Sequence, residues 1–149
     1  MIPNLLESND YEDDAISSTD VVKSVYENLG KGDVPAVLEL LDPQIVWREA
    51  EGSPNDSGDG WVGHDAVVNN LFIKLSEDWT EFTIHPETLH DAGSVVTVEA
   101  RYKGTHRATD KDMDCQVAHV WTVKGGKVTR FQQYVDTAKL QDVAGVNQN

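Results

Sequence analysis

Three polar residues are candidates for chemistry: Glu49 at the end of a predicted strand, and His119 and Gln133 on the apolar face of a predicted hairpin. Glu49 ends the segment Trp47-Arg48-Glu49, where a carboxylate at the mouth of a pocket could take a proton from carbon or activate a water molecule. His119 could donate or accept a proton near neutral pH, because an unperturbed histidine has a pKa of about 6.5. Gln133 could hold a carbonyl or hydroxyl group of a ligand through its amide. We therefore take Glu49 and His119 as acid/base candidates and Gln133 as a positioning residue.

Each of these residues also has a structural interpretation that involves no chemistry. Arg48 and Glu49 could be exposed polar residues at the end of a strand, since such charges are common. His119 could be a buried neutral histidine that is hydrogen-bonded to a neighbour. The sequence leaves both interpretations open.

Aromatic residues form a second group of candidates. Several of them pointing inward would make the kind of pocket that flat hydrophobic ligands prefer, although any single one could be ordinary core. The residues expected to contact a ligand, together with Gln133, are Tyr26, Trp47, Trp61, Phe72, Trp121 and Phe131, and Tyr102 is a further aromatic residue of this set.

The sequence predicts neither a metal site nor a cofactor. Asp110, Asp112 and Asp114 have the opening spacing of a calcium loop, but Cys115 and Trp121 replace its glycine and its final glutamate. The histidines outside position 119 show no paired metal-ligand spacing. The segment Lys124 to Lys127 contains two glycines but precedes no helix, so it is not a phosphate-binding loop.

Charge and size restrict the class of protein. The chain has 149 residues, with 12 basic and 26 acidic side chains, and a formal net charge of -14. Such a surface repels nucleic-acid phosphates, so we expect no nucleic-acid partner. A lone cysteine, Cys115, fits a reducing cytoplasm, and no apolar run or signal-peptide core indicates a membrane or secreted protein.

The register of a C-terminal hairpin decides which candidates share a face. A two-residue turn at Gly125-Gly126 would mix apolar and polar groups on both faces, whereas a three-residue loop, Lys124-Gly125-Gly126, pairs Val123 with Lys127 and separates the faces. We therefore predict the bulged loop, with His119 and Gln133 lying diagonally. The predicted apolar face is Cys115, Val117, His119, Trp121, Phe131, Gln133 and Val135, and the outer face is Gln116, Ala118, Val120, Thr122, Val128, Arg130, Gln132 and Tyr134.

The elements that position these residues follow from periodicity and capping signals. Apolar spacing predicts helices over 19–31, from 34 to about 41, and over 64–76, followed by strands over 81–90 and 94–106 and the hairpin. A strand over 44–49 leads into a polar loop over 50–61, which we expect to form a mobile lip. Helices first and antiparallel strands afterwards indicate an α+β domain over 19–141. Residues 1–18 read as an acidic, flexible tail and residues 142–149 as a C-terminal tail.

Several segments together resemble the SnoaL-like proteins of the nuclear transport factor 2-like superfamily. The resemblance covers about residues 19–141 and includes Gly32-Asp33 between two helices and a GGK hairpin near the end. It implies a cone-shaped fold in which three N-terminal helices pack on a strongly curved, mostly antiparallel sheet that encloses a pocket, and commonly a homodimer. The segments are VVKSVYENLGKGDVPAVLELL, QIVWREAEGSP, WVGHDAV and AHVWTVKGGKVTRFQQYVDTAKL.

The resemblance also shows where this chain departs from its relatives. SnoaL-like polyketide cyclases have a histidine at the position of His119 but a catalytic aspartate at that of Gln133, and a glutamine cannot act as a general acid or base. The ketosteroid isomerases, which tune the pKa values of their active-site carboxyl groups, place their general base at the position of Glu49. Their oxyanion-hole tyrosine falls near Val25, beside Tyr26, so their oxyanion hole does not carry over.

Two functions of different classes follow. The first is a cofactor-free enzyme on a small, largely apolar molecule, of the isomerase, cyclase, dehydratase or hydrolase type. The second is a non-catalytic module that binds such a molecule. In either case the outer sheet face, with Val120, Val128 and Tyr134, could form a homodimer interface.

Overall fold

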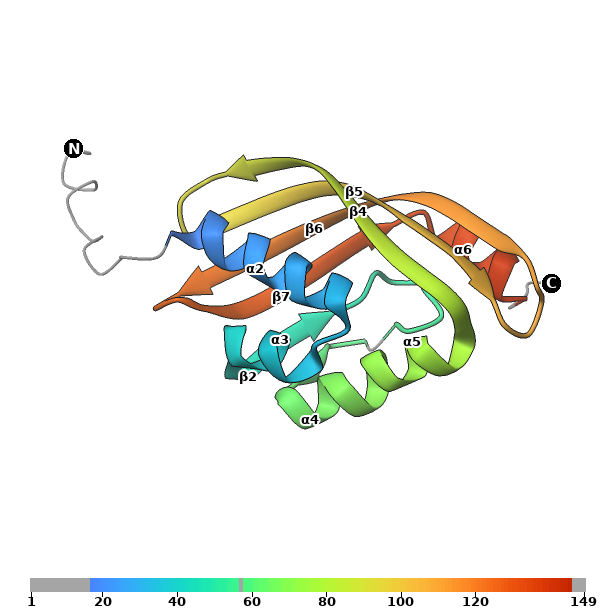
Figure 1. The fold of residues 1–149 in the computed structure, drawn as a ribbon, viewed down its shortest axis with the longest axis horizontal. Helices are drawn as coiled ribbons and strands as arrows, with labels where there is room; N and C mark the ends of the chain where they lie inside the picture. Colours follow the sequence, from blue (N-terminus) through green and yellow to red (C-terminus); the bar gives the residue numbers. More distant parts are fainter. Residues whose placement is uncertain (1–16, 57, 146–149) are drawn as a thin grey trace.

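Six strands form one curved, mostly antiparallel sheet in the computed structural model, which describes residues 17–56 and 58–145 (Figure 1). Their order is β3-β2-β7-β6-β5-β4, in which the pair β2 and β7 is parallel and the other pairs are antiparallel. The strands are β2 (Leu41–Arg48), β3 (Trp61–Val62), β4 (Trp79–Asp91), β5 (Val95–His106), β6 (Asp112–Lys124) and β7 (Lys127–Val135).

Helices cover one face of this sheet, as Figure 1 shows for the first of them. The third predicted helix is a continuous helical segment with one π-helical turn in its middle. None of the helices in the described part of the chain is long and apolar enough to cross a membrane. The α+β fold predicted from the sequence is confirmed. The helices are α2 (Ser18–Lys31), α3 (Val34–Leu40), α4 (His64–Val67), η1 (Val68–Phe72), α5 (Ile73–Asp78) and α6 (Thr137–Ala144).

Local signals explain where the first two helices begin and end. The side chain of Ser17 accepts a hydrogen bond from the backbone N–H of Asp20 at 3.0 Å and so caps α2. Gly32 ends this helix in a left-handed conformation with φ of 70°. Asp33 then caps α3 through the N–H of Ala36. This sharp junction allows α2 and α3 to pack on the same sheet.

Beyond its bulge, the hairpin of β6 and β7 has the predicted faces, but its turn differs from the predicted one. Gly125 and Gly126 form a two-residue turn, and both have positive φ, which is the pattern of a type I′ turn. The bulge lies instead at Thr129, between the pairs Val123–Val128 and Thr122–Arg130. His119 therefore lies directly opposite Gln133 rather than diagonally.

The displaced bulge has one further consequence. It turns Val128 to the inner side, where the residue is 0% exposed, so the prediction that Val128 lies on the outer face is wrong. A glycine loop can place its extra residue in the turn or in the strand after it. Polarity alternation alone does not distinguish the two, because both restore the same faces beyond the bulge.

The strands β4 and β5 approach each other closely where they bend. A Cβ atom at Gly104 would lie 2.3 Å from the carbonyl oxygen of Glu81, so only glycine fits there. Pro86 is tolerated because β4 is the edge strand of the sheet. In Figure 1, β4 follows α5 through this bend and then runs alongside β5.

The C-terminal helix α6 was not predicted, and it extends beyond residue 141, the end of the predicted domain. Asp136 caps it through the N–H of Lys139, and Gly145 ends it with φ of 76°. Its buried residues are Leu140 and Val143, which join the core. Of the predicted tails over 1–18 and 142–149, residues 1–16 and 146–149 lie outside the described residues.

Candidate functional site

A cavity of about 670 Å³ lies between the helices and the concave face of the sheet. Helices α2, α3, α5 and α6 contribute to its wall, as do η1 and the strands β2 and β4 to β7. This volume is within the range of ligand pockets for small molecules. Its aromatic wall consists of Tyr26, Trp47, Phe72, Trp79, Phe82, Tyr102, Trp121 and Phe131.

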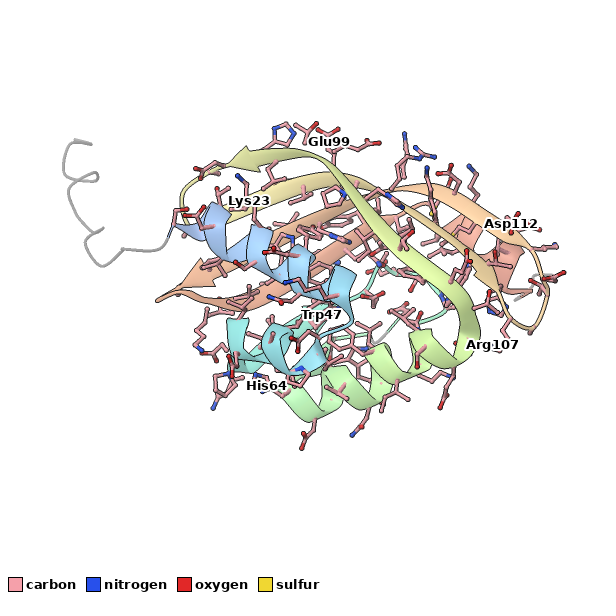
Figure 2. All side chains as sticks on the ribbon, viewed as in Figure 1. Lys23, Trp47, His64, Glu99, Arg107 and Asp112 are labelled. Carbon is pink, nitrogen blue, oxygen red and sulfur yellow. The ribbon has the colours of Figure 1, made fainter. Side chains whose placement is uncertain are left out.

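The aromatic side chains at the bottom of the cavity pack against one another. The ring of Trp47 stacks on Phe131 with centroids 4.0 Å apart, and Phe131 lies 4.6 Å from Trp121. Phe72 meets the edge of Trp47 from the helical side. Figure 2 shows Trp47 in the interior of the molecule, whereas Glu99 lies at its periphery. Such packing favours a rigid, preformed wall.

Glu49 is the buried carboxyl group of this cavity. It directly follows β2 and is 8% exposed, and its Oε2 accepts a hydrogen bond from the Trp47 indole N–H at 2.8 Å. Trp47 and Glu49 are two residues apart along an extended chain, so their side chains point to the same face. Burial raises the pKa of Glu49 from 4.5 to about 7, although hydrogen bonds from Trp47 and Gln133 oppose this. The group can therefore hold or release a proton near neutral pH.

His119 is bonded at both ring nitrogens to phenol groups. Its Nδ1 lies 2.6 Å from the Tyr26 hydroxyl, and its Nε2 lies 2.7 Å from the Tyr102 hydroxyl. The indole N–H of Trp121 donates to the Tyr26 oxygen at 2.9 Å. His119 comes from β6, while Tyr26 and Tyr102 come from α2 and β5. Three elements thus meet at one buried polar group.

Burial decides the protonation of this cluster. It lowers the pKa of His119 to about 3, so the imidazole is neutral in the physiological range. It raises the pKa values of Tyr26 and Tyr102 above the ordinary value of a phenol, so both hydroxyls keep their protons. The charge of Glu49 acts in the same direction on Tyr102.

Gln133 connects the cluster to the loop after β2. Its Oε1 accepts from the backbone N–H of Ala50 at 3.1 Å, and its Nε2 donates to the Tyr102 hydroxyl at 2.8 Å. A backbone N–H can only donate, so the bond to Ala50 fixes which end of the amide is oxygen. Gln133 therefore presents an N–H to Tyr102.

The structure brings most of the predicted site residues to one cavity. Glu49, His119 and Gln133 line it, and so do five of the six predicted aromatic residues. Trp61 is the exception: it lies on the edge strand β3, pairs with the backbone of Trp47, and is not part of the cavity wall. The aromatic residues present are Tyr26, Trp47, Phe72, Trp121 and Phe131.

Sequence reasoning missed several contributions to the site, among them the aromatic side chains of Trp79 and Phe82 on β4. Tyr102 was grouped with the aromatic residues, but its hydrogen bonds to His119 and Gln133 were not foreseen. Its place in the alternation from Val96 to Tyr102 was the available signal for an inward side chain. Leu140 of α6 also lines the cavity, and no signal for this helix was recognised.

A family model described as the SnoaL-like domain matches residues 22–131. A comparison with curated protein sequences gave no match.

Solved structures with the same fold include two proteins from Burkholderia. An NTF2-like protein from Burkholderia thailandensis has 34% sequence identity and a TM-score of 0.82, and the match covers 89% of this chain and 99% of that one. An NTF2-like protein of unknown function from Burkholderia pseudomallei has 24% identity and a TM-score of 0.79, with coverage of 87% and 98%. TerC, which was co-crystallised with polyporic acid, has 18% identity and a TM-score of 0.76, with coverage of 87% and 98%.

Proposed function

The chain belongs to the SnoaL-like domain family, whose model matches residues 22–131, and from this premise we propose that its cavity binds a small, largely apolar molecule on which Glu49 acts as a general acid or base. The observation that carries the proposal is a carboxyl group, 8% exposed, in an aromatic cavity and with a pKa of about 7. A group with this pKa can take a proton and return it at neutral pH.

The surroundings of Glu49 suit proton transfer to and from carbon. A carboxylate in an apolar cavity is poorly solvated, and this makes it a stronger base than a carboxylate in water. The indole N–H of Trp47 holds one carboxyl oxygen at 2.8 Å and so orients the group. Reactions in which a proton leaves one atom and returns at another, as in isomerisation, cyclisation or dehydration, need such a group.

We assign His119 a positioning role rather than an acid/base role. Both of its nitrogens are engaged by phenols, and a pKa of about 3 leaves little of the imidazolium form at neutral pH. The amide of Gln133 is likewise hydrogen-bonded to Ala50 and Tyr102. Glu49 is therefore the acid/base residue of this proposal.

A general-base probe tests the role of Glu49 without knowledge of the substrate. In 5-nitrobenzisoxazole, removal of the ring C–H proton breaks the N–O bond and gives a nitrile and a coloured nitrophenolate. We expect the full-length protein to accelerate this reaction with a rate that rises with pH and levels off above about 7. Glu49→Gln should lower the rate at least about 100-fold.

Glu51→Gln is the matched control, because Glu51 is exposed and lies two residues further along the same loop. It should leave the rate unchanged. A Glu49→Gln variant that retains the full rate would refute the assignment.

A second candidate function is ligand binding without turnover. The observation in its favour is that His119 and Gln133 satisfy their hydrogen bonds inside the protein, as structural residues do. The same probe distinguishes the two functions. Quenching of tryptophan fluorescence by 5-nitrobenzisoxazole without ring opening would support a binding module, since Trp47 and Trp121 line the cavity.

We also propose that the protein is a homodimer through the outer face of the sheet. Tyr134 is 59% exposed on this face, and Val120 lies near it on β6, whereas Val128 is buried and cannot contribute. An exposed aromatic residue on a sheet face is typical of an interface. Light scattering should give the mass of two chains for the native protein and of one chain for Tyr134→Glu; a native monomer would refute the proposal.

A further inference from the structure

The hydrogen-bonded groups around His119 have one more donor hydrogen than they have acceptors. Tyr26 accepts from the indole of Trp121, and Tyr102 accepts from the amide of Gln133. An indole N–H is only a donor, and the bond from Ala50 fixes the Gln133 amide with its N–H toward Tyr102. Neither Trp121 nor Gln133 can therefore accept a proton from a phenol.

The imidazole is then the one acceptor that the described residues offer to both hydroxyls. A neutral imidazole has one N–H and one lone pair. If Nδ1 carries the proton, Tyr102 donates to Nε2, and the Tyr26 proton has no partner. If Nε2 carries it, Tyr26 donates to Nδ1, and the Tyr102 proton has none. Both side chains line the cavity, so the cavity is the space into which the unpaired hydroxyl proton can be donated.

Cationic partners for a ligand are scarce in the same cavity. Arg107 is the one arginine or lysine among the described lining residues, and its guanidinium donates to the backbone carbonyls of Ser76, Glu77 and Trp79. Glu49, Asp33 and Asp78 also line the cavity. These bonds use three of the five N–H groups of Arg107, so a carboxylate or phosphate on the ligand would meet three acidic groups and one guanidinium that is already largely engaged.

We propose that Tyr26, His119 and Tyr102 form a hydrogen-bonding unit with one spare hydroxyl proton, which is donated to one acceptor oxygen of an uncharged carbonyl ligand. The tautomer of His119 decides whether Tyr26 or Tyr102 is the phenol that donates it. This inference rests on the proposed function, because it defines the ligand of the same cavity. It goes further in that the acceptor oxygen can be held at either of two positions.

The tautomer can be read directly from protein labelled with ¹⁵N at histidine, with His119 assigned from the signals that His119→Phe removes. In Tyr26→Phe, the proton should reside on Nε2, because only Tyr102 remains to accept it and a buried N–H without an acceptor is costly. In Tyr102→Phe, it should reside on Nδ1. The same tautomer in both variants, or a doubly protonated His119 in the native protein near neutral pH, would overturn the proposal.

Ligand class is tested on the native protein, so this part does not depend on the folding of a variant. We compare 2-acetylnaphthalene with 2-ethylnaphthalene, which lacks the acceptor oxygen, and with 2-naphthoate, which adds a negative charge. By tryptophan fluorescence, the ketone should bind at least about 10-fold more tightly than either of the others.

The outcomes separate the two proposals. If the hydrocarbon or the carboxylate binds as tightly as the ketone, the spare-proton inference fails while the binding function stands. If none of the three compounds binds, the proposed function fails as well.

Discussion

Gln133 occupies a position where an amide can do what a carboxylate cannot. Its Oε1 accepts a hydrogen bond from the backbone N–H of Ala50 and its Nε2 donates one to the hydroxyl of Tyr102, whereas an ionised carboxylate only accepts. An aspartate there would also be one methylene group shorter. The glutamine that separates this chain from the polyketide cyclases is therefore consistent with a site in which position 133 supports Tyr102 and the proton chemistry belongs to Glu49.

Replacement of Gln133 by leucine should destabilise the fold. Gln133 is 3% exposed, and the substitution leaves the N–H of Ala50 without its acceptor in a buried place. We expect a loss of about 2 kcal/mol in the free energy of unfolding, measured by urea denaturation. Gln116→Leu, on the exposed face of β6, should change it by less than about 0.5 kcal/mol. Equal losses in both variants would contradict this interpretation.

The residues of the site were predictable to the extent that face and polarity determine them. His119 and Gln133 were polar groups on an apolar face, and alternation alone placed them together. The position of Glu49 depended on a family resemblance. The bonds from His119 to Tyr26 and Tyr102 were not predictable, because they join elements far apart in the sequence, and no local pattern encodes which side chains meet.

In the hairpin of β6 and β7, the faces of the strands were predictable from the sequence, but the type of turn was not. Its inner face was correct from residue 115 to 121, because burial enforces alternation there. Its turn was wrong, because the bulge at Thr129 lies in a stretch where either register is acceptable locally. Helix α6 was missed for a related reason: it has only a few apolar residues, so its stability comes from the contacts of Leu140 and Val143 with the rest of the core.

The type I′ turn makes a prediction at Gly125. No atom lies within 4 Å of a Cβ built there, so a substitution is felt only through the positive φ of 59°. Asparagine tolerates this conformation, and Gly125→Asn should change the free energy of unfolding by less than about 0.5 kcal/mol. Gly125→Val should cost about 1–2 kcal/mol by urea denaturation. A three-residue loop with the bulge at Gly126 would give position 125 a negative φ, and Gly125→Val would then cost little.

The close approach of β4 and β5 leads to a prediction for Gly104. Gly104→Ala should lower the free energy of unfolding by at least about 1–3 kcal/mol, because its Cβ would meet the backbone of Glu81 at 2.3 Å. Gly30→Ala is the matched control within α2, where a Cβ meets nothing within 4 Å. It should stabilise the protein by about 0.5–1 kcal/mol. Thermal and urea unfolding of the two variants should thus shift in opposite directions.

At the scale of the whole molecule, the cavity confines two groups whose titrations oppose each other. The folded protein keeps the proton of Glu49 up to a pH of about 7, because its pKa is raised from 4.5. His119 stays unprotonated in the folded protein down to a pH of about 3, because its pKa is lowered from 6.5. The folded state thus binds a proton more than the unfolded state at Glu49 and a proton fewer at His119 over the range between 4.5 and 6.5. Their effects on stability cancel in part there.

Replacing Glu49 removes its contribution to the pH dependence of stability and leaves that of His119. As the pH rises from 4.5 to about 7, the native protein loses the stability that the raised pKa of Glu49 supplies at low pH, since the unfolded chain releases this proton first. Glu49→Gln keeps an acceptor for the Trp47 indole and has no proton to lose. Its free energy of unfolding relative to the native protein should therefore increase over this range by up to about 3 kcal/mol and stay constant above it. Urea denaturation of both proteins at several pH values checks this, because every other titrating group is common to the two and drops out of the difference. A difference that does not vary with pH would mean that Glu49 ionises as it does in water, and Glu49 would then lose its place as the acid/base residue of the cavity.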